Sequence, residues 1–190
     1  MKSAIILHGF QNEQEFHDPA QPAPGNGHWM PWLQKQLIIK DIAAWTPSVP
    51  HSWKLKYEHW VEEFERYPIT PETMLVGHSC GGGFIVRWLS ENPEAKVGKV
   101  VLVAPWINPV GEEDTDFFKF EINPNIVTQT DGITIFASDN DFDSVQKSVE
   151  ILKDKVNNIE CRDFHKYGHF CLSDMGTTEF PELRDHLLEN

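Results

Sequence analysis

The chain has 190 residues, of which 40% are hydrophobic, and its 16 basic and 29 acidic side chains give a formal net charge of -13. This length and apolar content suit one folded domain and exclude an intrinsically disordered chain. The negative charge repels phosphate backbones and anionic lipids, so neither nucleic acid nor a membrane is an expected partner. The three cysteines lack CxxC spacing, which argues against a disulfide framework or zinc site and suits a reducing cytoplasm.

The first half of the chain opens on the apolar run Ser3 to Leu7, which predicts a strand buried on both faces of a parallel sheet. This run is too short for a signal peptide, and no stretch of 18 apolar residues occurs, so we expect a cytoplasmic protein. The sequence then predicts a Pro- and Gly-rich loop, a helix, a strand and an amphipathic helix, at residues 19–27, 29–37, 42–46 and 53–67.

The second half continues the alternation of strands and helices. Strands are predicted at residues 73–76, 99–103, 133–137 and 159–164, and helices at residues 84–89, 145–156 and 181–188. Residues 104–127 show no clean period and are interpreted as an excursion or cap. The pattern predicts a single α/β domain over residues 1–190, with a mostly parallel sheet of about six strands and helices on both faces. In such a sheet the ligand site lies beyond the carboxyl ends of the strands.

The pentapeptide Gly77-His78-Ser79-Cys80-Gly81 fits the G-x-S-x-G pattern of a nucleophile elbow. In this turn a strand meets a helix so tightly that glycines are needed two residues on either side of the serine. A strand is predicted just before the motif and a helix just after it, so Ser79 is the candidate nucleophile. Cys80 fits less well, because His78 would then occupy a crowded position. An idle serine in a Gly-rich connector is the structural alternative.

A serine hydroxyl needs a base, and the base needs an orienting carboxylate. His169 follows the last predicted strand and completes the chain order Ser, Asp, His, whereas His165 lies at the strand's end and is interpreted as a surface residue. Three acids follow the strand at 133–137, namely Asp139, Asp141 and Asp143. Position alone leaves them close, and the central Asp141 is favoured.

The backbone N–H groups of Phe10 and Cys80 are the candidate oxyanion donors, because they follow the first strand and the nucleophile. Taken alone, His8-Gly9 would only end a strand. Aromatic side chains could line a substrate pocket or pack in the core, and the candidates are Phe10, Trp29, Trp106, Phe117, Phe118 and Phe170.

Several short segments together resemble one family, the YdeN-like and retinoblastoma-binding-protein-type serine hydrolases of the α/β-hydrolase superfamily. These segments are Ile5-Ile6-Leu7-His8-Gly9, His28-Trp29, Pro31-Trp32-Leu33, Gly77-His78-Ser79, Ser138 with Asp141, and Gly168-His169-Phe170. The resemblance runs almost end to end. It implies a compact α/β-hydrolase fold, carboxylic-ester hydrolysis and no cofactor, and it favours Asp141 as the acid, three residues after Ser138.

The expected activity is therefore hydrolysis of a small, uncharged ester through an acyl-enzyme on Ser79, with neither metal nor cofactor. A thioesterase or amidase with the same three residues is one alternative. The other is a non-catalytic module that binds a protein partner through its surface, for example through residues 104–127.

Overall fold

The computed structural model describes residues 2–189 and contains a six-stranded, wholly parallel sheet with the order β2-β1-β3-β4-β5-β6. The strands are β1 (Ser3–Leu7), β2 (Ala43–Trp45), β3 (Thr73–His78), β4 (Val100–Val103), β5 (Ile133–Ser138) and β6 (Glu160–Phe164). The strands β1, β3 and β4 are fully buried, as their continuous apolar runs predict. The predicted α/β class and sheet are confirmed.

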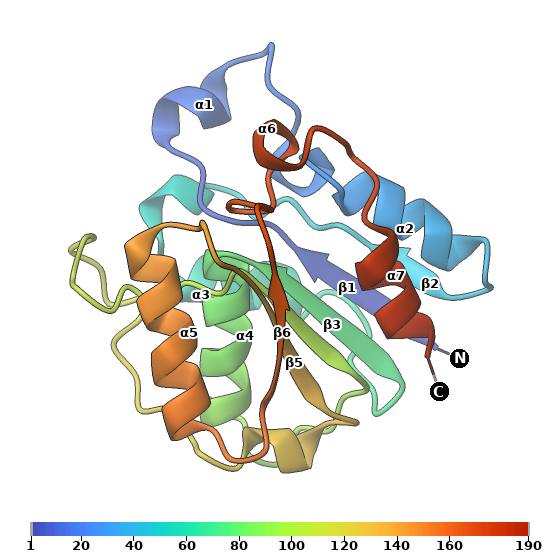
Figure 1. Ribbon diagram of the computed structural model, residues 1–190, viewed down its shortest axis with the longest axis vertical. Helices are drawn as coiled ribbons and strands as arrows, with labels where there is room; N and C mark the ends of the chain where they lie inside the picture. The colour runs from blue at the N-terminus through green and yellow to red at the C-terminus, as the bar shows by residue number, and fades with distance from the viewer. Residues whose placement is uncertain (1, 190) are drawn as a thin grey trace.

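Helices cover both faces of this sheet (Figure 1). On one face lie α3 (Tyr57–Phe64), α4 (Cys80–Glu91) and α5 (Asp143–Lys155), and on the other lie α2 (Met30–Ile38) and α7 (Pro181–Leu188). No helix in residues 2–189 is both long enough and apolar enough to cross a bilayer.

One predicted helix is shorter than expected, and two short helices were not predicted. The helix expected at 53–67 is reduced to α3, preceded by a 3-10 turn at Ser52–Lys54, because Leu55 takes a left-handed backbone with a φ of 42°. The loop after β1 contains α1 (Glu13–His17), which a capping box between Asn12 and Glu15 stabilises. A four-residue helix α6 (Leu172–Met175) follows the last strand. Both are too short to produce a visible periodicity.

The strand order reverses direction at β1, since β2 lies on one side of it and β3 on the other. In a doubly wound sheet this switch point opens a crevice at the carboxyl ends of the two central strands. The loops after β1 and β3 therefore meet there, and these loops carry Phe10 and Ser79.

Residues 104–127 pack against the helices of one face. The guanidinium of Arg87 on α4 donates to the carbonyls of Asp116 and Phe117, each at 2.9 Å. The Thr115 hydroxyl donates to the carbonyl of Leu55 at 2.7 Å. Phe117 has no exposed surface and packs against Trp60. The segment is thus anchored on α3 and α4.

Candidate active site

Ser79 lies in a sharp turn between β3 and α4, with a φ of 54° and a ψ of -122°. This backbone conformation is strained for a residue with a side chain. It is held on both sides, because the Ser79 N–H donates to Val103 at 2.9 Å and the Trp106 N–H donates to the Ser79 carbonyl at 3.0 Å. A Cβ at Gly77 would lie 2.6 Å from the Gly81 backbone, and one at Gly81 would lie 2.5 Å from the His8 carbonyl oxygen. The turn therefore has the steric demands that the motif predicts.

His169 faces a buried carboxylate. Its Nδ1 lies 2.9 and 3.1 Å from the two carboxylate oxygens of Asp141. The Asp141 side chain is 1% exposed and that of His169 is 14% exposed. Because an ionised carboxylate only accepts hydrogen bonds, this contact favours the tautomer of His169 that carries its proton on Nδ1.

The other two acids lie elsewhere. Asp139 accepts from His165 Nδ1 at 2.8 Å and from the Lys166 N–H at 2.9 Å, on the surface. This exposed pair raises the pKa of His165 and lowers that of Asp139, the hydrogen bond being the main cause in both. Asp143 is the first residue of α5. Of the three acids, Asp141 is the one in contact with His169.

The backbone of His169 is fixed by two further side chains. Its N–H donates to the Asp174 carboxylate at 2.9 Å, and its carbonyl accepts from Nε2 of His78 at 2.8 Å. Burial lowers the pKa of His78 well below its ordinary value, so the ring is neutral with its proton on Nε2. The sequence pattern predicts no role for His78 beyond its place inside the elbow motif. No sequence signal predicted that its ring would instead reach the loop of the base.

The two proposed oxyanion donors lie next to Ser79. A Cβ at Gly9 would lie 3.0 Å from the Cβ of Ser79, which places the loop after β1 against the elbow. The Phe10 N–H donates to no residue between 2 and 189. Cys80 is the first residue of α4, where an N–H has no partner within the helix. The Cys80 thiol is fully buried, and burial raises its pKa, so it is a poor nucleophile.

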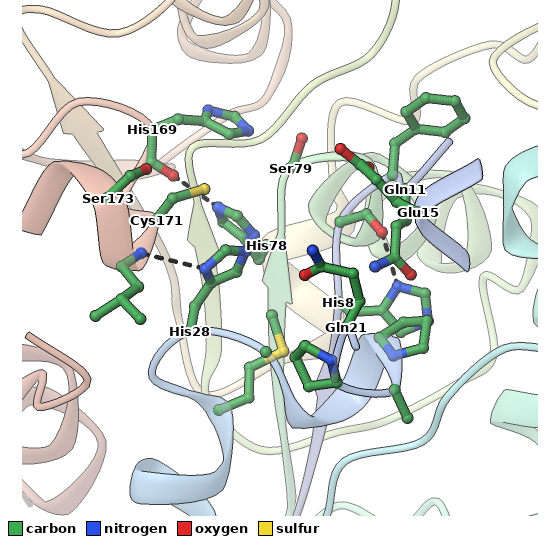
Figure 2. Close-up of a pocket in the computed structure, with 18 residues that line it drawn as sticks. His8, Gln11, Glu15, Gln21, His28, His78, Ser79, His169, Cys171 and Ser173 are labelled. Carbon is green, nitrogen blue, oxygen red and sulfur yellow. Dashed lines mark hydrogen bonds between the residues drawn. The ribbon is translucent and has the colours of Figure 1, made fainter. Parts of the chain in front are cut away.

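A cavity of about 620 Å³ is lined by Ser79, His169 and residues of the loop after β1. Figure 2 shows the hydroxyl of Ser79 and the ring of His169 on the same side of this cavity. Its polar lining includes Gln11, Glu15, Gln21, His28 and Ser173. No Lys or Arg is among the lining residues, and Glu15 is the one carboxylate.

Of the aromatic residues predicted to line the pocket, Phe10 does so. Trp29, Phe117 and Phe170 have no exposed surface and belong to the core, where burying their large apolar area is most favourable. Trp106 is almost buried and donates its indole N–H to Glu112 at 3.0 Å. Phe118 lines a separate groove with Ile107. The expectation for these five residues is corrected, since the cavity is lined largely by residues of 10–30.

The sequence model of a serine hydrolase family matches residues 4–189. The chain belongs to this family. YdeN of Bacillus subtilis is 29% identical over 106 residues, which span 54% of this chain and 50% of that relative. The match to this curated relative thus covers half of its length.

Solved structures of other proteins share the fold. The crystal structure of YdeN superposes with a TM-score of 0.82 at 23% identity and covers 99% of this chain and 97% of that one. Est1E from Butyrivibrio proteoclasticus, with ferulic acid bound, gives a TM-score of 0.62 at 12% identity over 99% of this chain and 88% of that one. The expected YdeN-like serine hydrolase family and α/β-hydrolase fold are confirmed.

Proposed function

We propose that this serine hydrolase cleaves carboxylic esters through an acyl-enzyme on Ser79, with His169 as base and Asp141 as the orienting acid. The supporting observation is the hydrogen bond between His169 Nδ1 and Asp141, on a ring that lines the same cavity as the strained Ser79. An imidazole oriented by a carboxylate, on the same cavity as an elbow serine, is the arrangement that activates such a nucleophile.

In the first step the Ser79 oxygen attacks the ester carbonyl while its proton passes to Nε2 of His169. The carbonyl oxygen becomes an oxyanion, which accepts hydrogen bonds from the N–H groups of Phe10 and Cys80. The Ser79 hydroxyl has no hydrogen-bond partner among residues 2–189, so Nε2 must approach it during the reaction. As the oxyanion collapses, His169 returns the proton to the leaving alcohol. Water then attacks the acyl-enzyme with His169 again as base, which releases the acid and restores Ser79.

The lining of the cavity supports an uncharged substrate. With one carboxylate and no Lys or Arg, it offers an anionic acyl group no permanently charged partner. Its volume of about 620 Å³ is in the range of small-molecule sites. That Est1E holds ferulic acid on the same fold is consistent with an acid product of this size.

Labelling with a fluorophosphonate tests the proposal, followed by mapping of the modified peptide and by hydrolysis of a p-nitrophenyl ester series. Ser79 should be labelled, and Ser79→Ala should lose about three or more orders of magnitude in turnover while remaining folded. Ser173→Ala is the matched control, because Ser173 lines the same cavity and is exposed. Labelling at another residue, or no hydrolysis of any ester, would overturn the proposal. An equal or greater rate with thioesters or amides would reassign the substrate class.

A further inference from the structure

His8 is a buried histidine that the proposed chemistry does not use. It directly follows β1, is 2% exposed, and packs against Trp60 with ring centroids 5.0 Å apart. Both ring nitrogens have backbone partners. Nε2 lies 3.0 Å from the amide nitrogen of Val49, and Nδ1 lies 2.7 Å from the carbonyl oxygen of Gly9.

These partners determine the tautomer of His8. The Val49 N–H can only donate, so Nε2 must be the unprotonated acceptor. The Gly9 carbonyl can only accept, so Nδ1 must carry the proton. The ring therefore makes both bonds only in the neutral form protonated at Nδ1. Burial lowers the pKa of His8 to about 4, which keeps this form populated at neutral pH.

The bond to Gly9 fixes a peptide that the proposed mechanism needs. The Gly9 carbonyl and the Phe10 N–H belong to one peptide plane, and in a trans peptide they point in opposite directions. Holding the carbonyl toward His8 therefore turns the Phe10 N–H away from His8. No other side chain in residues 2–189 bonds to the Gly9 carbonyl or the Phe10 N–H, so His8 is the side-chain restraint on their orientation.

We propose that His8 is a positioning residue, which holds the Gly9–Phe10 peptide so that the Phe10 N–H donates to the oxyanion formed on the substrate. The proposal rests on the proposed ester hydrolysis at Ser79. The nearness of Gly9 to Ser79, where an added Cβ would lie 3.0 Å from the serine Cβ, places this peptide at the reaction centre. The bond to Val49 serves a different purpose, since it fixes the tautomer that makes donation to Gly9 obligatory.

Two substitutions of His8 by amide side chains test its hydrogen bonds to Gly9 and Val49 one at a time. In His8→Asn, the side-chain amide nitrogen can take the place of Nδ1 and donate to Gly9, while the acceptor for Val49 is lost. In His8→Gln, the amide oxygen can take the place of Nε2 and accept from Val49, while the donor to Gly9 is lost. Both variants remove the imidazole from its contact with Trp60, so each controls for loss of packing in the other.

We expect His8→Gln to lower kcat roughly 10- to 100-fold with little change in KM, because a misdirected donor weakens binding of the oxyanion but not of the ground state. Its Ki for a trifluoromethyl ketone, which forms a charged tetrahedral adduct with the serine, should rise by the same factor. His8→Asn should remain within a few-fold of wild type in both, with thermal unfolding reporting the folded state of each variant.

A His8→Gln enzyme with wild-type kcat, or a His8→Asn enzyme impaired as much as His8→Gln, would overturn the positioning role. A long-range proton–nitrogen NMR spectrum that placed the His8 proton on Nε2 would overturn it as well. If instead the wild-type protein hydrolyses no ester, the function proposed at Ser79 fails first, and the role of His8 fails with it.

Discussion

The Nε2 atom of His78 lies 2.8 Å from the carbonyl oxygen of His169, so the residue before the nucleophile holds the backbone of the candidate base. The His169 N–H is held in turn by the Asp174 carboxylate at 2.9 Å. Side chains thus satisfy both backbone polar groups of His169, while Asp141 orients its ring. The candidate base is thus linked to the elbow of the candidate nucleophile through His78, the last residue of β3.

This hydrogen bond predicts that different substitutions of His78 lower kcat to different extents. Replacing it by Leu removes the donor to the His169 carbonyl, and we expect kcat to fall roughly 10- to 100-fold with KM little changed, because small displacements of a base cost rate. His78→Gln can place an amide nitrogen where Nε2 lies and should retain most of the rate. Steady-state kinetics over pH 5–9 measures both. Equal loss in the two variants, in proportion to their loss of stability, would show that His78 serves packing alone.

Replacing Asp141 and Asp139 separately by Asn distinguishes the roles of these two acids. Asp141→Asn should lower kcat by roughly four orders of magnitude, because an amide disrupts the tautomer that a carboxylate imposes on the base. Asp139→Asn should change kcat by less than a few-fold, since Asp139 pairs with His165 on the surface. Ester hydrolysis by the two purified variants, compared at pH 7.5, gives the result. A large loss in Asp139→Asn alone would reverse the assignment.

The positions of the proposed catalytic residues are more predictable from the sequence than the shape of the cavity. Ser79, Asp141 and His169 each follow a predicted strand, and the topology of a parallel sheet brings strand ends together, so local pattern determines their placement. The cavity is formed by the irregular loop 10–30, whose course depends on tertiary contacts such as the bond from Trp29 Nε1 to the Phe170 carbonyl at 3.1 Å. No periodicity encodes such contacts. Composition also cannot separate a buried Phe117 from an exposed Phe10.

Because His8 is buried in its neutral form, we expect the protein to be less stable in acid. The pKa of His8 is about 4 in the folded protein, against 6.5 when unfolded, so below pH 6.5 the unfolded chain binds more protons than the folded one. The free energy of unfolding should therefore fall as the pH is lowered from about 6.5 to about 4, by about 3 kcal/mol from this residue. His78 contributes with the same sign, because burial also lowers its pKa.

Urea unfolding at intervals between pH 7 and pH 4 measures this loss. His8→Asn removes the titrating group and should lose less stability over the same interval than wild type, although it begins less stable. Each protein gives a slope of unfolding free energy against pH, and the difference between the two slopes cancels the contributions of the groups that both proteins share. The exposed Asp139 is one of these groups, and because its pKa is lowered from 3.8, its contribution changes mainly at a pH below this interval. Parallel slopes for the two proteins would contradict a neutral, buried His8.

The backbone strain at Ser79 should lower the free energy of unfolding by a measurable amount. Its φ of 54° and ψ of -122° are unfavourable for alanine as well as serine, whereas glycine adopts them readily. Glycine relieves the strain in the folded state, but it also gains more conformational freedom in the unfolded chain, which reduces the net benefit. The free energy of unfolding of Ser79→Gly should therefore be about 1 kcal/mol higher than that of Ser79→Ala. Both variants should be inactive, so urea unfolding is the measurement. At Ser173, in the short helix α6, the order should be reversed, with the Ala variant more stable than the Gly variant. The same order at both positions would mean that the turn at Ser79 stores no strain.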